Sequence, residues 1–243
     1  MPLPSILLLQ AREPNDPVIP EEVAIFARNA RVPVEQVTPH NLLLGAPTMS
    51  QVRHYDAVMI GGSGEYFVSR GNLPHMDATL ELLAEIVDAG HPMFASCFGF
   101  QLIVCALGGT ITYSPELMEL GTYPLMLTGE GLADELFGKM PLHFTALLGH
   151  KDRATAFPAS LPNLAFSERS PFQALRVPGK PIWATQFHPE LTRDENLGRF
   201  KRYIDLYAQS IPPDELQTTL DRFQPAPETE KLIPRFMEIV FGD

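Results

Sequence analysis

The chain has 243 residues, of which 45% are hydrophobic and 19% charged, and its formal net charge at pH 7 is −11. That composition is typical of a globular protein with one sizeable core, and no apolar run approaches the ~20 residues that span a bilayer. The acidic balance, without any cluster of basic residues, argues against nucleic acid or an anionic membrane as a partner.

The first half of the chain predicts alternating strands and helices. Its amino-terminal residues lack the basic segment and the small-residue cleavage site of a secretory signal, so we expect a cytoplasmic protein. Because strands joined through helices favour parallel pairing, we predict an α/β fold whose strands end at a common edge of the sheet. Apolar runs predict strands at residues 5–9, near Val37, at 55–60 and at 93–95, and helical periodicity predicts helices at 21–30, at 76–89 and from Leu102 to a stop at Gly108.

A glycine-rich segment, GGSG at residues 61–64, follows the strand at 55–60. It is too short for a phosphate-binding loop and no Lys-Ser or Lys-Thr pair follows it, so nucleotide binding has weak support. Two interpretations remain open. The segment is either a plain turn or a loop whose backbone N–H groups face the oxyanion of a reaction, because glycine lets the backbone approach a ligand closely.

Cys97 lies between the strand at 93–95 and the next helix. At the amino terminus of a helix, unpaired N–H groups and the helix dipole stabilise a thiolate. Ala95 and Gly99 are small enough for the tight turn of a nucleophile elbow, although alanine stands where the first glycine is usual. The alternative is an inert core thiol, because cysteine is often buried. The second cysteine, Cys105, is expected to pack in the core, so neither a disulfide scaffold nor a cysteine metal site is predicted.

The second half of the chain predicts shorter segments. Short strands separated by turns indicate antiparallel or mixed additions to the sheet, and the helices that follow have apolar faces that need a partner surface. The last strand, at residues 181–187, ends at His188. The short strands are expected at 110–113, 121–127, 144–148, 165–167 and 173–176, and the helices at 194–207, 214–223 and 228–241.

His188, Pro189 and Glu190 form the motif that carries most weight after the cysteine. Proline blocks a helix at His188, and an extended chain places the imidazole and the carboxylate on the same side. The carboxylate could then fix one ring nitrogen and leave the other to take a proton from a thiol. The alternative is a polar strand end that faces solvent, which we favour less because an elbow cysteine is also present. His150 follows the strand at 144–148 and could lie over the same edge.

With these residues in place, the chain resembles the class I glutamine amidotransferases, which use a Cys-His-Glu triad. The resemblance covers residues 57–191, with its best likeness to the glutaminase domain of GMP synthetase. It implies a flavodoxin-like, three-layer α/β/α fold with a central, mostly parallel sheet, formed by residues 1–209, and a C-terminal helical extension at 210–243 packed on the same domain. Five ordered motifs carry it: GGSGE at 61–65, CFGFQ at 97–101, Glu119-Leu120-Gly121, His150-Lys151-Asp152 and QFHPE at 186–190.

The resemblance implies that Cys97 is the nucleophile, His188 the general base and acid, and Glu190 its orienting carboxylate. The reaction would be hydrolysis of the γ-amide of glutamine through a cysteinyl thioester, giving glutamate and ammonia, with no metal or cofactor. The resemblance also implies the rest of the pocket: the backbone N–H groups of Gly62 and Phe98 as an oxyanion hole, Gln101 at the amino-acid end of the substrate, Gly64, and His150 with the turn that follows it.

Two functions are open for such a site. Its ammonia could pass to a synthetase on a partner chain, because no ATP-binding or acceptor domain is predicted here, or the protein could hydrolyse γ-glutamyl compounds for their own sake. A non-catalytic regulatory module is less favoured because all three residues of the triad are present. The related cysteine-elbow peptidases and chaperones usually have a histidine just after the nucleophile, so we rank them last. The C-terminal helices could cover the sheet, bind a partner or form a homo-oligomer.

Overall fold

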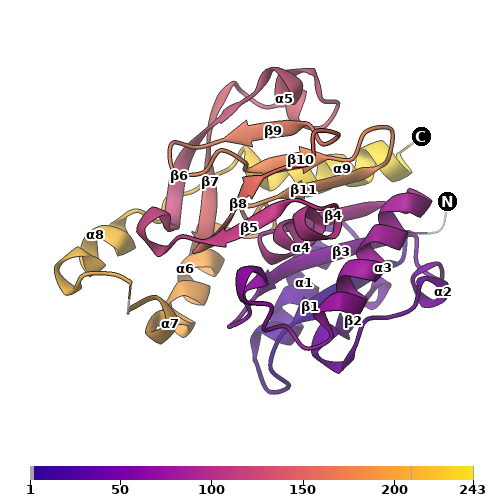
Figure 1. Cartoon of the computed structure of the whole chain (residues 1–243), viewed down its shortest axis with the longest axis horizontal. Helices are drawn as coiled ribbons and strands as arrows, with labels where there is room; N and C mark the ends of the chain where they lie inside the picture. Colours follow the sequence, from indigo (N-terminus) through magenta and orange to yellow (C-terminus); the bar gives the residue numbers. More distant parts are fainter. Residues whose placement is uncertain (1–2, 209, 243) are drawn as a thin grey trace.

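The computed structural model describes residues 3–208 and 210–242. Within these ranges the strands form a nine-stranded mixed sheet and a separate two-stranded sheet (Figure 1). The large sheet consists, in chain order, of β1 (Ile6–Ala11), β2 (Val37–Asn41), β3 (Ala57–Ser63), β4 (Met93–Ser96), β6 (Glu119–Leu127), β7 (His143–His150), β9 (Asn163–Phe166), β10 (Ala174–Arg176) and β11 (Ile182–Thr185), and the small sheet of β5 (Thr110–Tyr113) and β8 (Asp152–Ala156).

The large sheet is mostly parallel. Its order is β2-β1-β3-β4-β11-β10-β9-β6-β7, and the first five of these strands pair in parallel. The remaining pairings are antiparallel, so β10 and β6 run against the other strands. The predicted combination of a parallel core with antiparallel or mixed additions is therefore confirmed.

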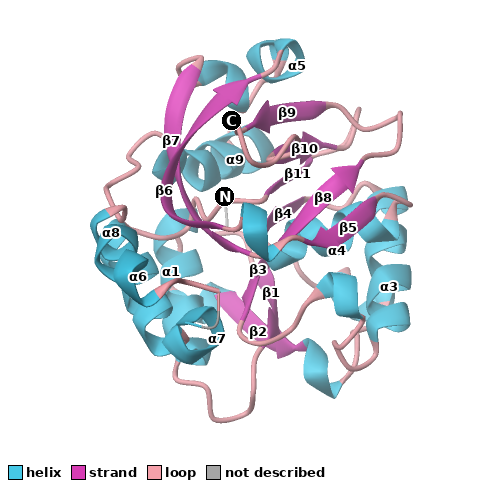
Figure 2. Cartoon of the chain, turned by 60° about the vertical axis from the view of Figure 1, so that its left-hand side comes forward, coloured by secondary structure: helices cyan, strands magenta, loops and turns pink. Residues whose placement is uncertain are grey.

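Side chains alternate along each buried strand, so both faces of the sheet are apolar. Helices cover both of these faces. Ile6 and Leu8 of β1 face one apolar cluster, whereas Leu7 and Leu9 face the other. The first cluster includes α1 and α9, the second α3 and α4, and Figure 2 shows α1 and α3 on opposite sides of the sheet. This is the predicted three-layer α/β/α fold. The helices are α1 (Val18–Ala30), α2 (Met49–Val52), α3 (Met76–Ala89), α4 (Phe98–Ala106), α5 (Gly129–Ala133), α6 (Arg193–Arg202), α7 (Ile204–Ala208), α8 (Leu216–Asp221) and α9 (Leu232–Phe241).

Two local predictions were wrong. The glycine segment at 61–64 is not a loop from its first residue, because β3 continues to Ser63, which pairs with Ala11 of β1. The helix predicted at 194–207 is interrupted at Tyr203, whose φ of −101° and ψ of 25° end α6. Its hydroxyl lies 3.0 Å from Arg12 Nη1, so a tertiary contact overrides the local helical preference.

The C-terminal segment packs on the same core as the rest of the chain. Phe236 of α9 lies 5.6 Å from the ring of Phe94 on β4 and 5.9 Å from that of Trp183 on β11, in edge-on geometry. The division into residues 1–209 and 210–243 stays a prediction, and Gln209, at its boundary, lies outside the described residues. In the described ranges, no helix combines the length and the apolar character needed to cross a membrane.

Candidate active site

Four neighbouring parallel strands deliver polar groups to one pocket at the edge of the sheet. Arg12 follows β1, Gly62 is the second-last residue of β3, Cys97 follows β4, and His188 comes shortly after β11. All four residues line the same pocket, at the carboxyl ends of the strands, where open α/β sheets bind ligands. The predicted meeting of the glycine segment with the cysteine is therefore confirmed.

The backbone at Cys97 is strained in the manner of a nucleophile elbow. Its φ of 50° and ψ of −99° lie outside the regions that non-glycine residues prefer, and it is the residue that precedes the first turn of α4. Its own N–H donates to the carbonyl of Thr185, 2.7 Å away on β11. A Cβ at Gly99 would lie only 2.7 Å from Cβ of Ile60 on β3, so the helix can pack this closely only with glycine there.

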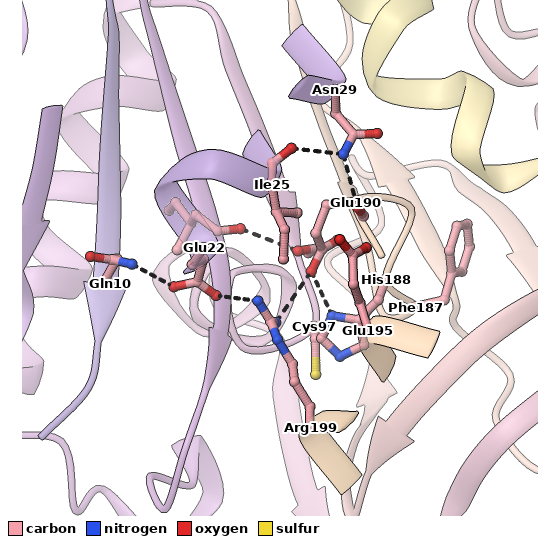
Figure 3. A network of polar contacts seen from close by, with 12 residues as sticks. Gln10, Glu22, Ile25, Asn29, Cys97, Phe187, His188, Glu190, Glu195 and Arg199 are labelled. Atoms are coloured by element: carbon pink, nitrogen blue, oxygen red, sulfur yellow. Dashed lines mark hydrogen bonds and ion pairs between the residues drawn. The ribbon is translucent and has the colours of Figure 1, made fainter. Parts of the chain in front are cut away.

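His188 and Glu190 form a buried hydrogen-bonded pair beside the sulfur of Cys97 (Figure 3). The distance from Nδ1 of His188 to Oε1 of Glu190 is 2.7 Å, which is the geometry that the His-Pro-Glu motif predicts. The main chain is fixed as well. The N–H of His188 donates to the carbonyl of Leu147, and the carbonyl of Glu190 accepts from Asn29 Nδ2 at 2.8 Å.

Charges around the pair favour its ionised form. Burial alone would lower the pKa of His188, but the negative charges of Cys97 and Glu190 outweigh burial and raise that pKa to about 10. Burial alone would raise the pKa of Glu190, but the His188 ring and the Arg199 guanidinium lower it instead. At neutral pH the site therefore presents an imidazolium held between a carboxylate and a sulfur.

A second set of hydrogen bonds reaches the sulfur of Cys97 from Gln186, which follows the neighbouring strand β11. Gln186 Nε2 lies 3.8 Å from Cys97 Sγ, within the range of an N–H···S hydrogen bond. The oxygen of the same carboxamide accepts from Gln101 Nε2 at 3.2 Å, and Gln101 Nε2 also donates to the carbonyl of Asp152 at 3.0 Å. Both hydrogens of the Gln101 amide therefore have acceptors, which leaves its oxygen as the atom that could accept from a ligand.

His150 anchors this second set at the floor of the pocket. Its Nδ1 lies 2.9 Å from the carbonyl of Asp152, and its Nε2 lies 3.1 Å from Oε2 of Glu119. Gln173 Nε2 donates to the same Glu119 oxygen at 2.6 Å. Burial alone would raise the pKa of Glu119, but the hydrogen bond and the charge of His150 lower it. Both ring nitrogens of His150 therefore face hydrogen-bonding oxygens, and these contacts fix the orientation of the ring.

The remaining predicted residues also lie around the pocket. A Cβ at Gly62 would stand 3.0 Å from Cε1 of His188, so only glycine leaves the ring in place. Gly64 lies against the Tyr203 ring and Arg12, and a Cβ there would be 3.5 Å from the ring. Phe98 is the first residue of α4, where backbone N–H groups have no acceptor within their own helix. The structure thus brings together every residue that the sequence singled out.

Several residues of the site, either lining the pocket or in contact with Cys97, carried no role in the sequence-based prediction. Gln186 belongs to the QFHPE motif, so that motif could have suggested it. Arg12 and Arg199 contact the pocket from β1 and α6, and nothing in their local sequence indicates this. Tyr203, at the break between α6 and α7, and Tyr207, on α7, also line the pocket, and the Tyr207 hydroxyl donates to the carbonyl of Gly149 at 3.0 Å. Among the described residues, no group of three or more His, Cys, Asp or Glu side chains could hold a metal ion.

Comparison with known proteins gives a family match over most of the chain. The family described as glutamine amidotransferase class-I matches residues 26–200. The chain is 33% identical over 120 residues to the GMP synthase (glutamine-hydrolyzing) of Lactococcus lactis subsp. lactis, and this match covers 49% of this chain and 23% of that protein. It is 31% identical over 123 residues to one of the subunits of the GMP synthase (glutamine-hydrolyzing) of Methanococcus aeolicus, and this match covers 51% of this chain and 63% of that relative.

Solved structures share the fold at low sequence identity. A glutamine amidotransferase from Thermotoga maritima superposes with a TM-score of 0.72 at 19% identity, covering 97% of each chain. A glutamine amidotransferase from Methylobacillus flagellatus gives a TM-score of 0.67 at 18% identity, covering 98% of this chain and 92% of the other. The whole described fold, including the C-terminal helices, therefore has counterparts among known structures.

Proposed function

The chain belongs to the class I glutamine amidotransferase family, and we propose that it hydrolyses the γ-amide of glutamine through a thioester on Cys97, releasing glutamate and ammonia. One observation carries the proposal: a cysteine in a strained elbow lies beside a histidine that is paired at 2.7 Å with a buried glutamate. A core thiol without a function would need neither the strain nor the charged partners.

The first chemical step is acylation of the cysteine. The Cys97 thiolate attacks the carbonyl carbon of the γ-carboxamide, and a C–S bond forms as the carbonyl oxygen becomes an oxyanion. The imidazolium of His188 then gives its proton to the nitrogen as the C–N bond breaks, and ammonia leaves. In the second step His188 takes a proton from water, whose oxygen attacks the thioester and releases glutamate and the thiolate.

Backbone donors would stabilise the oxyanion. We assign this role to the N–H groups of Gly62, near the end of β3, and of Phe98, the first residue of α4, because both residues line the same pocket as Cys97. Fixed N–H donors at the point where charge develops are often the largest single contribution to such reactions. The helix dipole of α4 favours negative charge at the same place.

The amino-acid end of glutamine would bind on the side of Gln101. Both hydrogens of Gln101 Nε2 have acceptors, so its oxygen would accept a hydrogen bond from the α-ammonium group. Gly64 and the segment from His150 to Asp152 would close the remaining walls, because both line the same pocket. This assignment accounts for the hydrogen bonds that hold Gln101 in one orientation.

A partner chain would supply the acceptor of the ammonia. The Methanococcus relative is named as one subunit of a GMP synthase, and the Lactococcus relative is a longer protein of which the match covers 23%. We therefore propose a synthetase partner that uses the ammonia. Hydrolysis of γ-glutamyl peptides without a partner is the second candidate that the test below distinguishes.

The test is release of glutamate from glutamine and from γ-glutamyl dipeptides by the purified chain, with Cys97→Ala as the control. Because a synthetase partner could be needed for turnover, the same proteins are treated with a diazo-ketone analogue of glutamine, and the labelled residue is located by mass spectrometry. Cysteine-dependent glutamate release, or labelling of Cys97 that glutamine prevents, supports the proposal. A folded protein with neither would overturn it, and release from dipeptides alone would favour the second candidate.

A further inference from the structure

Buried charges of alternating sign form a row that ends at the proposed catalytic pair, and Figure 3 shows three of them, Glu22, Arg199 and Glu190. Arg12 Nη2 lies 3.1 Å from Oε1 of Glu22 on α1, and the same Glu22 oxygen lies 3.4 Å from Arg199 Nη2. Arg199 Nη1 then lies 3.9 Å from Oε1 of Glu190. The side chains of Arg12, Glu22 and Glu190 are no more than 1% exposed and that of Arg199 is 11% exposed. The row therefore links the end of β1 to His188 through two helices.

Arg199 interacts with both carboxylates by charge rather than by hydrogen bonds. Its Nη1 and Nη2 atoms are buried and have no hydrogen-bond partner among the described residues, and the same is true of Glu190 Oε2. Attraction between opposite charges falls off slowly with distance where water is excluded, so a guanidinium at 3.9 Å still acts strongly on a buried carboxylate. Burial favours a protonated Glu190, and Arg199 adds to the larger effect of the His188 ring in lowering the pKa of this carboxyl group.

Glu22 holds Arg199 in this position. Its Oε2 accepts from Gln10 Nε2 at 2.8 Å, and its Oε1 faces both Arg12 and Arg199. The same helix also carries Asn29, which holds the carbonyl of Glu190 at 2.8 Å. Helix α1 thus fixes the main chain of Glu190 directly and its carboxylate through Arg199.

We propose that Arg199 is a positioning residue: anchored by Glu22, it keeps Glu190 ionised and directed at His188, and so maintains the imidazolium that pairs with the Cys97 thiolate. The catalytic meaning of this inference rests on the proposed function. The test of the inference does not, because the state of the Cys97 sulfur can be measured without any substrate.

Arg199 lines the pocket, so two other roles must be separated from this one. It could simply tie α6 to α1, or it could bind the substrate. A matched control exists for the first role, because Arg202 lies on the same helix and bridges to Glu21 of α1 at 3.2 Å on the surface. A change in KM without a change in kcat would indicate the second role.

The central experiment measures how fast iodoacetamide alkylates Cys97 over the pH range in which thiols and imidazoles titrate. Cys105→Ala serves as the parent, since Cys105 is half-buried, and mass spectrometry confirms that Cys97 is modified. In Arg199→Met we expect the rate near neutral pH to fall by about tenfold and the profile to move to higher pH, because a shift of one pKa unit changes the thiolate fraction about tenfold. Arg199→Lys should restore part of the rate, and Arg202→Met should match the parent.

The titratable and charged groups that line the same pocket from other elements are not substituted in these variants. They include Arg12 after β1, Tyr66 after β3, Cys97 before α4, the segment from His150 to Asp152, Tyr203 just before α7 and Tyr207 within it. Thermal unfolding of each variant checks that it is folded. A folded Arg199→Met protein whose alkylation profile superimposes on that of the parent would overturn the proposal.

A double variant decides whether Arg199 acts through Glu190. In the Glu190→Gln background there is no carboxylate to keep ionised, so Arg199→Met should cause no further loss of alkylation rate. An additional tenfold loss in that background would contradict the proposal. If the parent releases glutamate, Arg199→Met should lower kcat about tenfold with KM changed less than about threefold, and the opposite pattern would make it a substrate-binding residue. If the parent neither releases glutamate nor shows glutamine-protected labelling of Cys97, the proposed function fails but the alkylation result still stands.

Discussion

The amide nitrogen of Gln186 lies 3.8 Å from the sulfur of Cys97, one residue beyond the last paired positions of β4 and β11, Ser96 and Thr185. Its orientation is fixed, because Gln101 Nε2 donates to the oxygen of the same carboxamide. The sulfur is therefore approached by His188 from one side and by a neutral N–H donor from the neighbouring strand. A donor in this position favours the thiolate over the thiol.

Gln186→Leu removes that donor while keeping the side-chain volume similar. We expect glutamate release to fall about tenfold, since a hydrogen bond to a charged group contributes about 1.5–3 kcal/mol, and the alkylation rate of Cys97 at neutral pH to fall with it. Steady-state assays and iodoacetamide kinetics on the purified variant measure both. An unchanged alkylation rate would mean that the contact does not stabilise the thiolate.

The strained backbone at Cys97 predicts an inverse relation between stability and activity. Cys97→Gly and Cys97→Ala should both be inactive, but the glycine variant should be more stable by about 1–2 kcal/mol, because only glycine adopts a φ of 50° with this ψ at little cost. Urea denaturation of the two variants gives the difference. Equal stability would argue that the elbow is not strained in solution.

Glu190→Gln should impair turnover less than loss of the cysteine does, because the carboxylate orients His188 and does not react. We expect measurable residual glutamate release, against none above background for Cys97→Ala. Parallel assays at high enzyme concentration check this. Complete loss in both variants would show that Glu190 does more than orient the ring.

The pH dependence of turnover follows from His188. Its pKa is raised to about 10, and the ring must be protonated to give a proton to departing ammonia, so activity should persist through neutral pH and be lost as the pH rises through about 10. Removing the negative charge of Glu190 removes one cause of the raised pKa. In Glu190→Gln the alkaline fall should therefore occur at lower pH. A profile of kcat against pH that is the same in both proteins would contradict this explanation.

Gly62→Ala tests the close approach of β3 to the histidine ring. The new methyl group would stand 3.0 Å from Cε1 of His188, so the ring must move, and we expect turnover to fall by about a hundredfold, the loss that a small misplacement of a catalytic group can cause. Gly198→Ala, on α6, is the matched control, because a Cβ there has no atom within 4 Å. Similar activity in the two variants would show that the site tolerates the displacement.

The sequence was sufficient to predict those parts of the site whose geometry is local. The elbow at Cys97 follows from a strand, small residues and a helix in succession, and the pair of His188 and Glu190 follows from a proline that keeps the chain extended. The shared edge of the sheet follows from parallel connections. These features depend on residues that are neighbours in the chain.

The sequence did not predict the parts that depend on long-range packing. Arg12 and Arg199 are far apart in the chain, and only the folded sheet brings both to Glu22. The extension of β3 to Ser63 depends on pairing with β1, and the end of α6 at Tyr203 accompanies a contact with Arg12. Local preference is decided in these places by contacts that form only in the complete fold.

The packing of Phe236 against Phe94 and Trp183 also bears on biosynthesis. Strands β4, which ends just before Cys97, and β11, which ends shortly before His188, are made by the ribosome well before α9, which covers one of their faces. Until that helix emerges, the nascent chain exposes two large aromatic side chains on an incomplete sheet, a surface that chaperones recognise. The nucleophile is therefore synthesised early but assembled late, and a chain interrupted before α9 should be both inactive and prone to aggregate.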